Sequence, residues 1–295
     1  MNGDTAMTTA LPAPSAQRAP GLRMTPGRIL TLAIGIPLAV ILIAWTSFSI
    51  VAQIGQASFP VSYTIPVHHG QLVTDVASGN VTVRQGGGNT AHLTGIVQYS
   101  LIRPSITENT TASGTTVDLR CHIQVGNCGL NAALSVPART DVTLSSGGGD
   151  QTVSGLAGNV ALSSDGGNIA VSDVGGNASV STGGGDLAAS GLAGRLTFST
   201  GGGNISGNPL ASLYVNAQSG GGDVSLVFTQ PPRNLDIVSG GGNINVVLPH
   251  GDTAYDISTS SGGGNISEPV NINASAPDKI TVDSGGGDIS ITEAS

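Results

Sequence analysis

The sequence predicts an all-β protein built as a parallel β-solenoid, and two regularities in its 295 residues carry that prediction. A glycine-rich turn that ends in Asn or Asp returns from Asp150 onward at steps of 18 to 23 residues. A period near 20 residues is typical of repeat proteins, in which each unit buries its apolar side only against its neighbours. The residues after each turn alternate between inward apolar and outward small or polar positions, which indicates short, half-buried strands.

The chain begins with a segment that predicts a membrane anchor. Residues 1–28 contain four prolines and three arginines and are expected to form a disordered cytoplasmic tail. Residues 29–54 contain no charged side chain, and a membrane span needs about 20 apolar residues. No basic residue follows until Arg84, so the positive-inside rule predicts a single pass through the plasma membrane with the C-terminal domain outside. A cleavable signal ending near Gly55–Ala57 is the alternative.

Between this anchor and the regular repeats, the sequence predicts a linker over 55–68 and an N-terminal cap over 69–140 that includes a first coil. Long solenoids need an atypical unit to seal their first rung. Cys121 and Cys128 are the only cysteines and lie outside the membrane in the predicted topology, so we expect a disulfide between them. A metal site that uses His122 is the alternative, although the spacing matches no zinc pattern.

The regular solenoid is expected over 141–295, with about 18–23 residues in each coil. Two nine-residue strand-and-turn units form one coil of the flattened, two-sided first part, and the longer coils after Asn204 are expected to gain girth. Inward positions are predicted to be Val160, Leu162, Ile169, Val171, Ala178, Val180, Leu187, Ala189, Leu196 and Phe198. The residues between them, such as Ala161 and Ser179, are predicted to face outward. Gln151 interrupts this pattern.

The Asn or Asp of each turn is expected to stack into a column along one edge of the solenoid. The predicted column is Asp150, Asn168, Asp186, Asn204, Asp223, Asn243, Asn265 and Asp288. Carboxylates and amides alternate almost throughout, which keeps like charges apart on neighbouring rungs and favours hydrogen bonds along the edge. Calcium-binding rolls also repeat every nine residues, but this turn lacks the second glycine and the aspartate of their motif. We therefore expect structural turns and no metal, with glycines such as Gly184 at positive φ.

Composition and motifs argue against several classes of function. Residues 55–295 carry seven Lys or Arg against 17 Asp or Glu, so the basic surface that nucleic-acid binding requires is missing. The sequence has no nucleophile elbow, zinc-protease helix, P-loop or dinucleotide-binding motif, and therefore predicts no catalytic residues and no cofactor. A polysaccharide-acting enzyme, which would need acidic residues converging in a groove, is the least favoured alternative.

The repeated GGGD and GGGN turns followed by Ile, Leu or Val, as at Gly183–Leu187 and Gly240–Ile244, resemble those of the bacterial DUF4097 family of adhesin-like proteins. Leu134–Val142 resembles the lead into that family's repeats. The resemblance covers roughly residues 70–295 and implies a β-solenoid, often on a membrane anchor, with no defined activity. We therefore expect a non-enzymatic scaffold or binding module for an envelope protein or a cell-wall polymer. The ectodomain of a sensor or regulatory membrane protein is the alternative.

Overall fold

The computed structural model describes residues 34–47, 56–67, 70–100, 102–111, 114–121 and 128–294. The chain divides into two compact units, Met1–Ile50 and Val51–Ser295, and each is considered by itself. In the first unit, residues 34–47 form a helix. No helix within the described ranges is both long and apolar enough to cross a bilayer. The predicted tail and both flanks of the predicted span, 29–33 and 48–54, lie outside the described residues.

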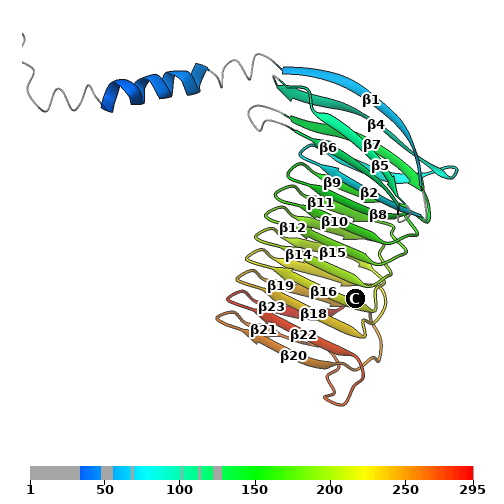
Figure 1. Cartoon of the computed structure of the whole chain (residues 1–295). Coiled ribbons are helices and arrows are strands. Elements are labelled where there is room, and N and C mark those ends of the chain that lie inside the picture. The colour runs from blue at the N-terminus through cyan, green and yellow to red at the C-terminus, as the bar shows by residue number, and fades with distance from the viewer. Residues whose placement is uncertain are drawn as a thin grey trace, which may run out of the picture. The chain divides into compact units, whose positions relative to one another are not determined.

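The second unit is an all-β stack of two sheets, as the sequence predicted (Figure 1). In spatial order, sheet A consists of β1 (Gln56–Pro66), β4 (Thr90–Ser100), β7 (Cys128–Pro137), β3 (Val81–Gly86), β9 (Gln151–Ser154), β11 (Ile169–Ser172), β13 (Leu187–Ser190), β15 (Ile205–Leu210), β17 (Val224–Phe228), β19 (Ile244–Leu248), β23 (Ile289–Glu293) and β21 (Ile266–Ser267). Sheet B consists of β20 (Asp256–Ser261), β22 (Lys279–Ser284), β18 (Asn234–Ser239), β16 (Tyr214–Ser219), β14 (Leu196–Thr200), β12 (Ala178–Thr182), β10 (Val160–Ser164), β8 (Asp141–Ser146), β2 (Gln71–Val76), β6 (Gly114–Arg120) and β5 (Ser105–Thr111).

Each coil contributes one strand to sheet B and then one to sheet A, and equivalent strands of neighbouring coils pair in parallel. Leu162 pairs with Val180, and Val180 pairs with Phe198, so inward side chains stack on like positions between the sheets. The predicted inward residues are all buried, and Ser179 in the alternate position is exposed. The phase of the strands is therefore confirmed.

Gln151 occupies a core position of β9 despite its polar side chain. It is fully buried and pairs in register with Ile169 of the next coil. Its Nε2 donates a hydrogen bond of 2.6 Å to the backbone carbonyl of Ser163 on the facing sheet. A buried amide is tolerated when it is hydrogen-bonded, and this bond satisfies the donor, whereas Oε1 finds no partner among the described residues.

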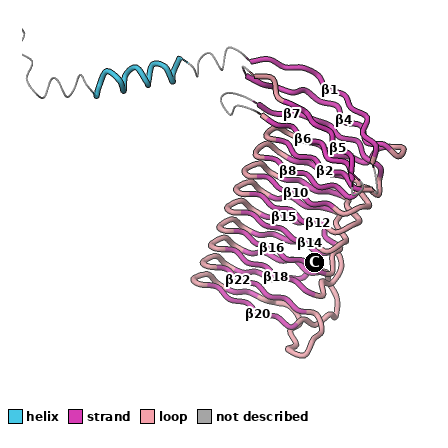
Figure 2. Tube along the Cα trace, in the orientation of Figure 1, coloured by secondary structure: helices cyan, strands magenta, loops and turns pink. Residues whose placement is uncertain are grey.

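Two kinds of edge close the coil, and Figure 2 shows their loops on opposite sides of the stack. From β8 onward, the first edge, from sheet B to sheet A, keeps one length: nine residues separate Leu196 from Ile205 and also Leu235 from Ile244. The second edge, from sheet A to sheet B, takes the extra residues of the longer coils. The pairing of β15 with β17 also contains a register shift, between Gly207 and Leu210. The coils therefore stay two-stranded.

The N-terminal end of the stack does not follow the order of the sequence. The β2/β3 coil lies between the β6/β7 coil and the β8/β9 coil, with parallel pairing on both sides. Antiparallel strands then continue both sheets: β4 pairs with β7, β1 pairs with β4, and β5 pairs with β6. The prediction of a linker over 55–68 is wrong for Gln56–Pro66, which is the edge strand β1. Its Pro60 and Pro66 are compatible with an edge, where an N–H need not pair.

The C-terminal end is also rearranged. The last coil in the sequence, β22/β23, lies between the β18/β19 coil and the β20/β21 coil. The chain therefore forms the terminal rung first and returns to fill the rung inside it. Segment 268–278 makes this return, and Tyr255 bridges Ile272 within it.

Candidate functional site

The first edge carries a continuous hydrogen-bonded column, which we call the first ladder. At each rung, the backbone N–H of the Asn or Asp donates to Oδ1 of the residue one rung before it, over 2.7–3.0 Å. The observed order is Asn131, Asn80, Asp150, Asn168, Asp186, Asn204, Asp223, Asn243, Asp288 and Asn265. From Asn80 onward acid and amide alternate, because the rearranged C-terminal coil places Asp288 between two asparagines.

The glycines of these turns are required by close stacking of the backbone, and the predicted positive φ at Gly184 is wrong. The φ of Gly184 lies outside the left-handed region, and a Cβ placed there meets nothing within 4 Å. A Cβ on Gly183 or Gly185 would lie 2.1 Å from a backbone carbonyl oxygen of the previous turn. The first and third glycines of the triplet therefore let neighbouring turns approach, and the middle one is free of that constraint.

A second column of side chains lies inside the same edge. The buried hydroxyl of Thr182 donates to the carbonyl of Gly167 over 2.8 Å and accepts from the N–H of Gly185 over 3.2 Å. Thr200 repeats this arrangement with Gly185 and Gly203. Each hydroxyl therefore joins its own turn to the previous one and satisfies backbone groups that the turn leaves unpaired.

The second edge begins with the same chemistry and then departs from it. Asn159 donates from its N–H to Asp141 Oδ1, Asn177 to Asn159 Oδ1, and Arg195 to Asn177 Oδ1, over 2.6–2.9 Å. An arginine side chain has no acceptor, so this second ladder ends at Arg195.

The described residues offer no cage for a metal ion. They contain no group of three or more His, Cys, Asp or Glu side chains that could hold one. Along the first ladder, the Oδ1 of Asp150, Asp186, Asp223 and Asp288 each accept a backbone N–H. The geometry of the turns is therefore that of a hydrogen-bonded edge.

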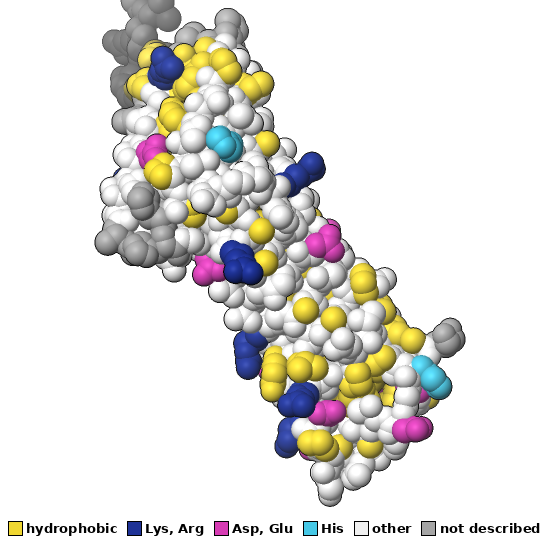
Figure 3. Space-filling view, turned by 90° about the vertical axis from the view of Figure 1, so that its right-hand side faces the viewer, with side chains coloured by type: hydrophobic (Ala, Val, Ile, Leu, Met, Phe, Trp, Pro, Cys, Tyr) yellow, Lys and Arg dark blue, Asp and Glu magenta, His cyan; other side chains and the backbone are white. Residues whose placement is uncertain are grey.

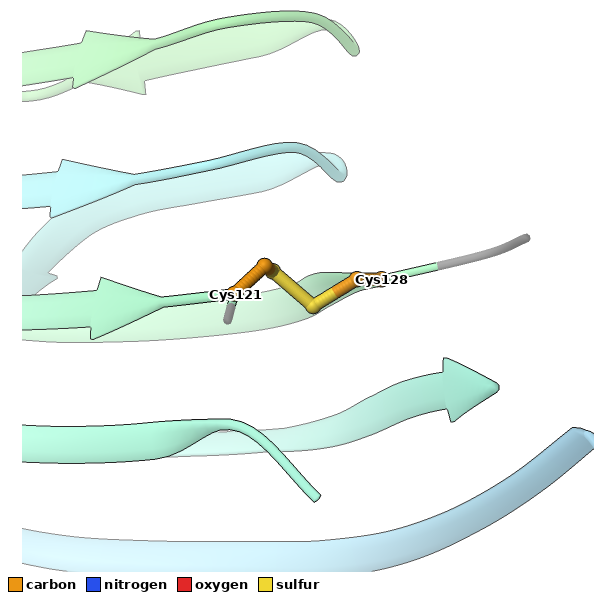
Figure 4. The surroundings of a disulfide bond; sticks show 2 residues. All are labelled: Cys121 and Cys128. Carbon is orange, nitrogen blue, oxygen red and sulfur yellow. A yellow bond between two sulfur atoms is a disulfide. The ribbon is translucent and has the colours of Figure 1, made fainter. Parts of the chain in front are cut away.

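Cys121 and Cys128 form a disulfide that joins the end of β6 in sheet B to the start of β7 in sheet A (Figure 4). Their Cα atoms are 6.2 Å apart. Both cysteines line a surface depression of about 610 Å³ together with Ser78, Gln98 and Gly129. The alternative ligand His122 lies outside the described residues.

Acidic side chains on the outer face of sheet B are held by neighbouring polar groups. Asp236 accepts a hydrogen bond of 2.9 Å from Asn216 Nδ2, and Asp118 pairs with Arg120 over 2.5 Å. Asp75 lies opposite Asp118 in register, and the hydrogen bond to Asp118, together with the charges of both carboxylates, raises the pKa of Arg120.

A shallow groove follows the second edge. Its upper part, about 470 Å³, is lined by the second ladder and by outward residues of sheet B such as Thr143 and Ser179. Its lower part, about 760 Å³, is lined by Arg195, Tyr214, Arg233, Asn234 and residues 277–279. Arg195 belongs to both parts. In the sequence, Arg195 occupies a position in the nine-residue series that Asn or Asp fills elsewhere, and no local pattern indicates that it would meet Arg233 and Lys279.

The family model for Toastrack DUF4097 matches residues 69–292, which is most of the solenoid and its N-terminal end. The chain belongs to the DUF4097 family. The ladders, the stacked glycines and the two edges described above are therefore those of one DUF4097 solenoid.

Three solved structures are similar to this DUF4097 chain. A proposed adhesin from Bacteroides fragilis is 16% identical, with a TM-score of 0.46, and covers 80% of this chain and 97% of its own. A proposed adhesin from Parabacteroides merdae is 10% identical, with a TM-score of 0.34, and covers 81% of this chain and 96% of its own. A proposed cell adhesion protein from Clostridium sporogenes is 10% identical, with a TM-score of 0.33, and covers 80% of this chain and 100% of its own. No curated protein matches the sequence.

Proposed function

We propose that this protein is a single-pass membrane protein whose β-solenoid lies outside the plasma membrane and binds an envelope protein or a cell-wall polymer without catalysis. The observation that carries the proposal is the outer face of sheet B. Thr143, Ala161, Ser179 and Thr197 follow one another in register across four rungs, and all four are exposed. Such small side chains leave a regular surface with a spacing of ~4.8 Å between rungs. A partner with its own repeat can contact many rungs at once.

The anchor is supported by the first 54 residues. The uncharged stretch 29–54 follows Arg18, Arg23 and Arg28, which favours a cytoplasmic N-terminus. Large apolar side chains on the helix at 34–47 are exposed, including Ile41 at 63% and Ile43 at 64%. A lipid environment would cover them.

Binding is supported by the form of the scaffold. Hydrogen bonds fix both edges and the core is continuous along the stack, so the outer face is pre-organised and loses little conformational entropy when a partner binds. The groove along the second edge adds concave surface to this face.

Two measurements test the proposal. Protease added to intact cells should remove the C-terminal domain and spare an N-terminal tag, and a protected C-terminal domain would overturn the topology. The full chain, purified in mild detergent and immobilised, should retain an envelope protein or wall glycan from a fractionated envelope. Failure to retain either class, while an unrelated immobilised envelope-binding protein succeeds on the same fractions, would overturn the binding role.

A further inference from the structure

The type of residue at the position of the second ladder changes halfway along the solenoid. In register, Asp141, Asn159 and Asn177 are followed by Arg195, Tyr214, Asn234 and Lys279 on successive rungs. The first three support their neighbours through side-chain oxygens. The later residues are not needed for that purpose, because the longer coils reach the second edge through other backbone contacts, such as Arg233 N–H to the carbonyl of Leu213.

Cations gather at this point in a sparsely charged chain whose net charge is negative. Residues 55–295 contain seven Lys or Arg, and Arg195, Arg233 and Lys279 line the same depression. Figure 3, which faces the second edge, shows Lys and Arg side chains along one side of its lower part. The only carboxylate of the lining is Asp278, and Asp256 lies 3.6 Å from Lys279. Across the described part of the chain, no ion pair joins Arg195 or Arg233 to an acid.

Two of these cations are close neighbours. The N–H of Lys279 donates to the carbonyl of Arg233 over 2.9 Å, so the two residues lie on adjacent rungs. The register places Asn234 directly opposite Lys279, so the two cations are offset by one residue along the groove. An anion bound at the groove can therefore meet both positive charges.

An aromatic ring lies beside the cations. Tyr214 is half-buried, and the guanidinium carbon of Arg195 lies 4.5 Å from the centre of its ring. This cation–π contact holds the guanidinium over the ring and leaves its donors available at the groove. A planar ring can contact the apolar face of a sugar, arginine guanidiniums can bind its acid groups, and exposed amides can bind its hydroxyls.

The length of the cationic site favours a chain-like ligand. Arg195 and Lys279 are separated by three rung steps, or ~14 Å. A single small anion cannot contact both ends. We propose that the groove from Asn177 to Lys279 binds a linear polysaccharide bearing carboxylate or phosphate groups, with Arg195, Arg233 and Lys279 contacting the acid groups and Tyr214 the sugar. This inference rests on the proposed envelope-binding function and names the ligand class and the residues.

The test uses the full chain in mild detergent and defined polymers. Polygalacturonate supplies carboxylates, a phosphate-bearing mannan supplies phosphates, dextran is the neutral glycan, polyglutamate is the sugar-free polyanion, and inorganic phosphate is the small anion. Binding is measured by calorimetry or by retardation in affinity gels. We expect one or both acidic glycans to bind more tightly than polyglutamate, dextran and phosphate, and their affinity to fall as salt is raised.

The substitutions Arg195→Gln, Arg233→Gln and Lys279→Gln should each weaken binding about two- to fivefold, and the triple variant at least about tenfold. Lys279→Arg keeps the positive charge and should therefore bind the acidic glycans more tightly than Lys279→Gln does, with most of the wild-type affinity. Arg84→Gln is the matched control, because it removes one exposed cation from β3 on sheet A. Circular dichroism and melting temperature establish that each variant is folded.

Two results would overturn the inference. One is that the folded triple variant still binds the acidic glycans as tightly as wild type, or that Arg84→Gln weakens this binding as much as the groove substitutions do. The other is equal binding of polyglutamate and the acidic glycans, or no binding of either acidic glycan. The proposed function is judged separately: if wild type and triple variant retain the same envelope component, the binding role stands and this site is wrong. If wild type retains none, the binding role itself is wrong.

Discussion

The backbone N–H of Asp288 donates a hydrogen bond of 2.9 Å to Oδ1 of Asn243, which lies 45 residues earlier in the chain. Asn265 lies between them in sequence but one rung further out in space, where its N–H donates to Asp288 over 2.7 Å. Two amides that follow each other in the sequence are thereby separated by a carboxylate. The C-terminal part of the first ladder consequently contains no pair of amides on neighbouring rungs.

The ladder predicts a graded response at Asp186, whose Oδ1 accepts the N–H of Asn204 over 2.7 Å. Asp186→Asn keeps an acceptor and should change the free energy of unfolding by less than about 0.5 kcal/mol. Asp186→Ala removes it and should cost about 1 kcal/mol, because the exposed N–H then bonds to water. Urea unfolding measures both changes.

The same ladder predicts that calcium has no effect on stability. Millimolar calcium or EDTA should leave the melting temperature unchanged, whereas an ion held only by the folded state would add about 2.7 kcal/mol at a hundredfold excess over Kd. Calcium-dependent folding, or unfolding caused by Asp186→Asn, would make the turns a metal site.

Neighbouring glycines of one turn should respond in opposite ways. In Gly185→Ala the new Cβ would lie 2.1 Å from the carbonyl oxygen of Gly167, and neither backbone can move away without disturbing the stack. We expect a loss of at least about 1–3 kcal/mol. Gly184→Ala places its Cβ in open space and should change stability by less than about 0.5 kcal/mol. Equal losses from the two variants, measured by thermal unfolding, would contradict the stacking explanation.

The core and the outer face differ at adjacent residues. Val180→Asp would bury an unpaired charge between the sheets, where Val180 is 2% exposed, and should cost at least about 3 kcal/mol or prevent folding. Ser179→Asp points outward and should be nearly silent. Soluble yield and denaturant midpoint distinguish the two, and a silent Val180→Asp would be incompatible with the observed strand phase.

The disulfide should stabilise the N-terminal end of the stack. Cys121 and Cys128 are seven residues apart, and closing so short a loop restricts the unfolded chain by about 2.5 kcal/mol. The double change to alanine should therefore lower the free energy of unfolding by about that amount. Thiol titration of protein from intact cells should find no free cysteine in wild type; two free thiols there would argue against an oxidising compartment.

Alkaline pH should destabilise the C-terminal end through Tyr255. Burial, followed by the negative charges of Asp278 and Glu293, raises the pKa of Tyr255 to about 12. The unfolded phenol ionises near pH 10, so the folded state binds more protons between about pH 10 and 12. Its contribution to stability is complete below pH 10 and is lost as the pH rises through this window. Tyr255→Phe should flatten that part of the pH profile; an unchanged slope would exclude Tyr255 as the cause.

The sequence by itself determined the repeat, the strand phase and the composition of the first ladder. Alternation after each turn places Leu162, Val180 and Phe198 on one face, and a nine-residue half-coil follows from the spacing of the turns. These properties are local, since they depend on residues within one or two coils. Period and alternation are therefore enough to predict them.

The tertiary structure alone decided which coils become neighbours and what meets along the second edge. A parallel rung can accept any strand whose inward pattern fits, so the sequence does not reveal that β22/β23 enters inside β20/β21 or that 56–66 pairs as an edge strand. At Gly183 and Gly185 the glycine constraint likewise arises from a carbonyl in the previous turn and not from the residue's own φ. The approach of Arg195, Arg233 and Lys279 follows from coil stacking across more than 80 residues, a long-range contact that no local spacing records.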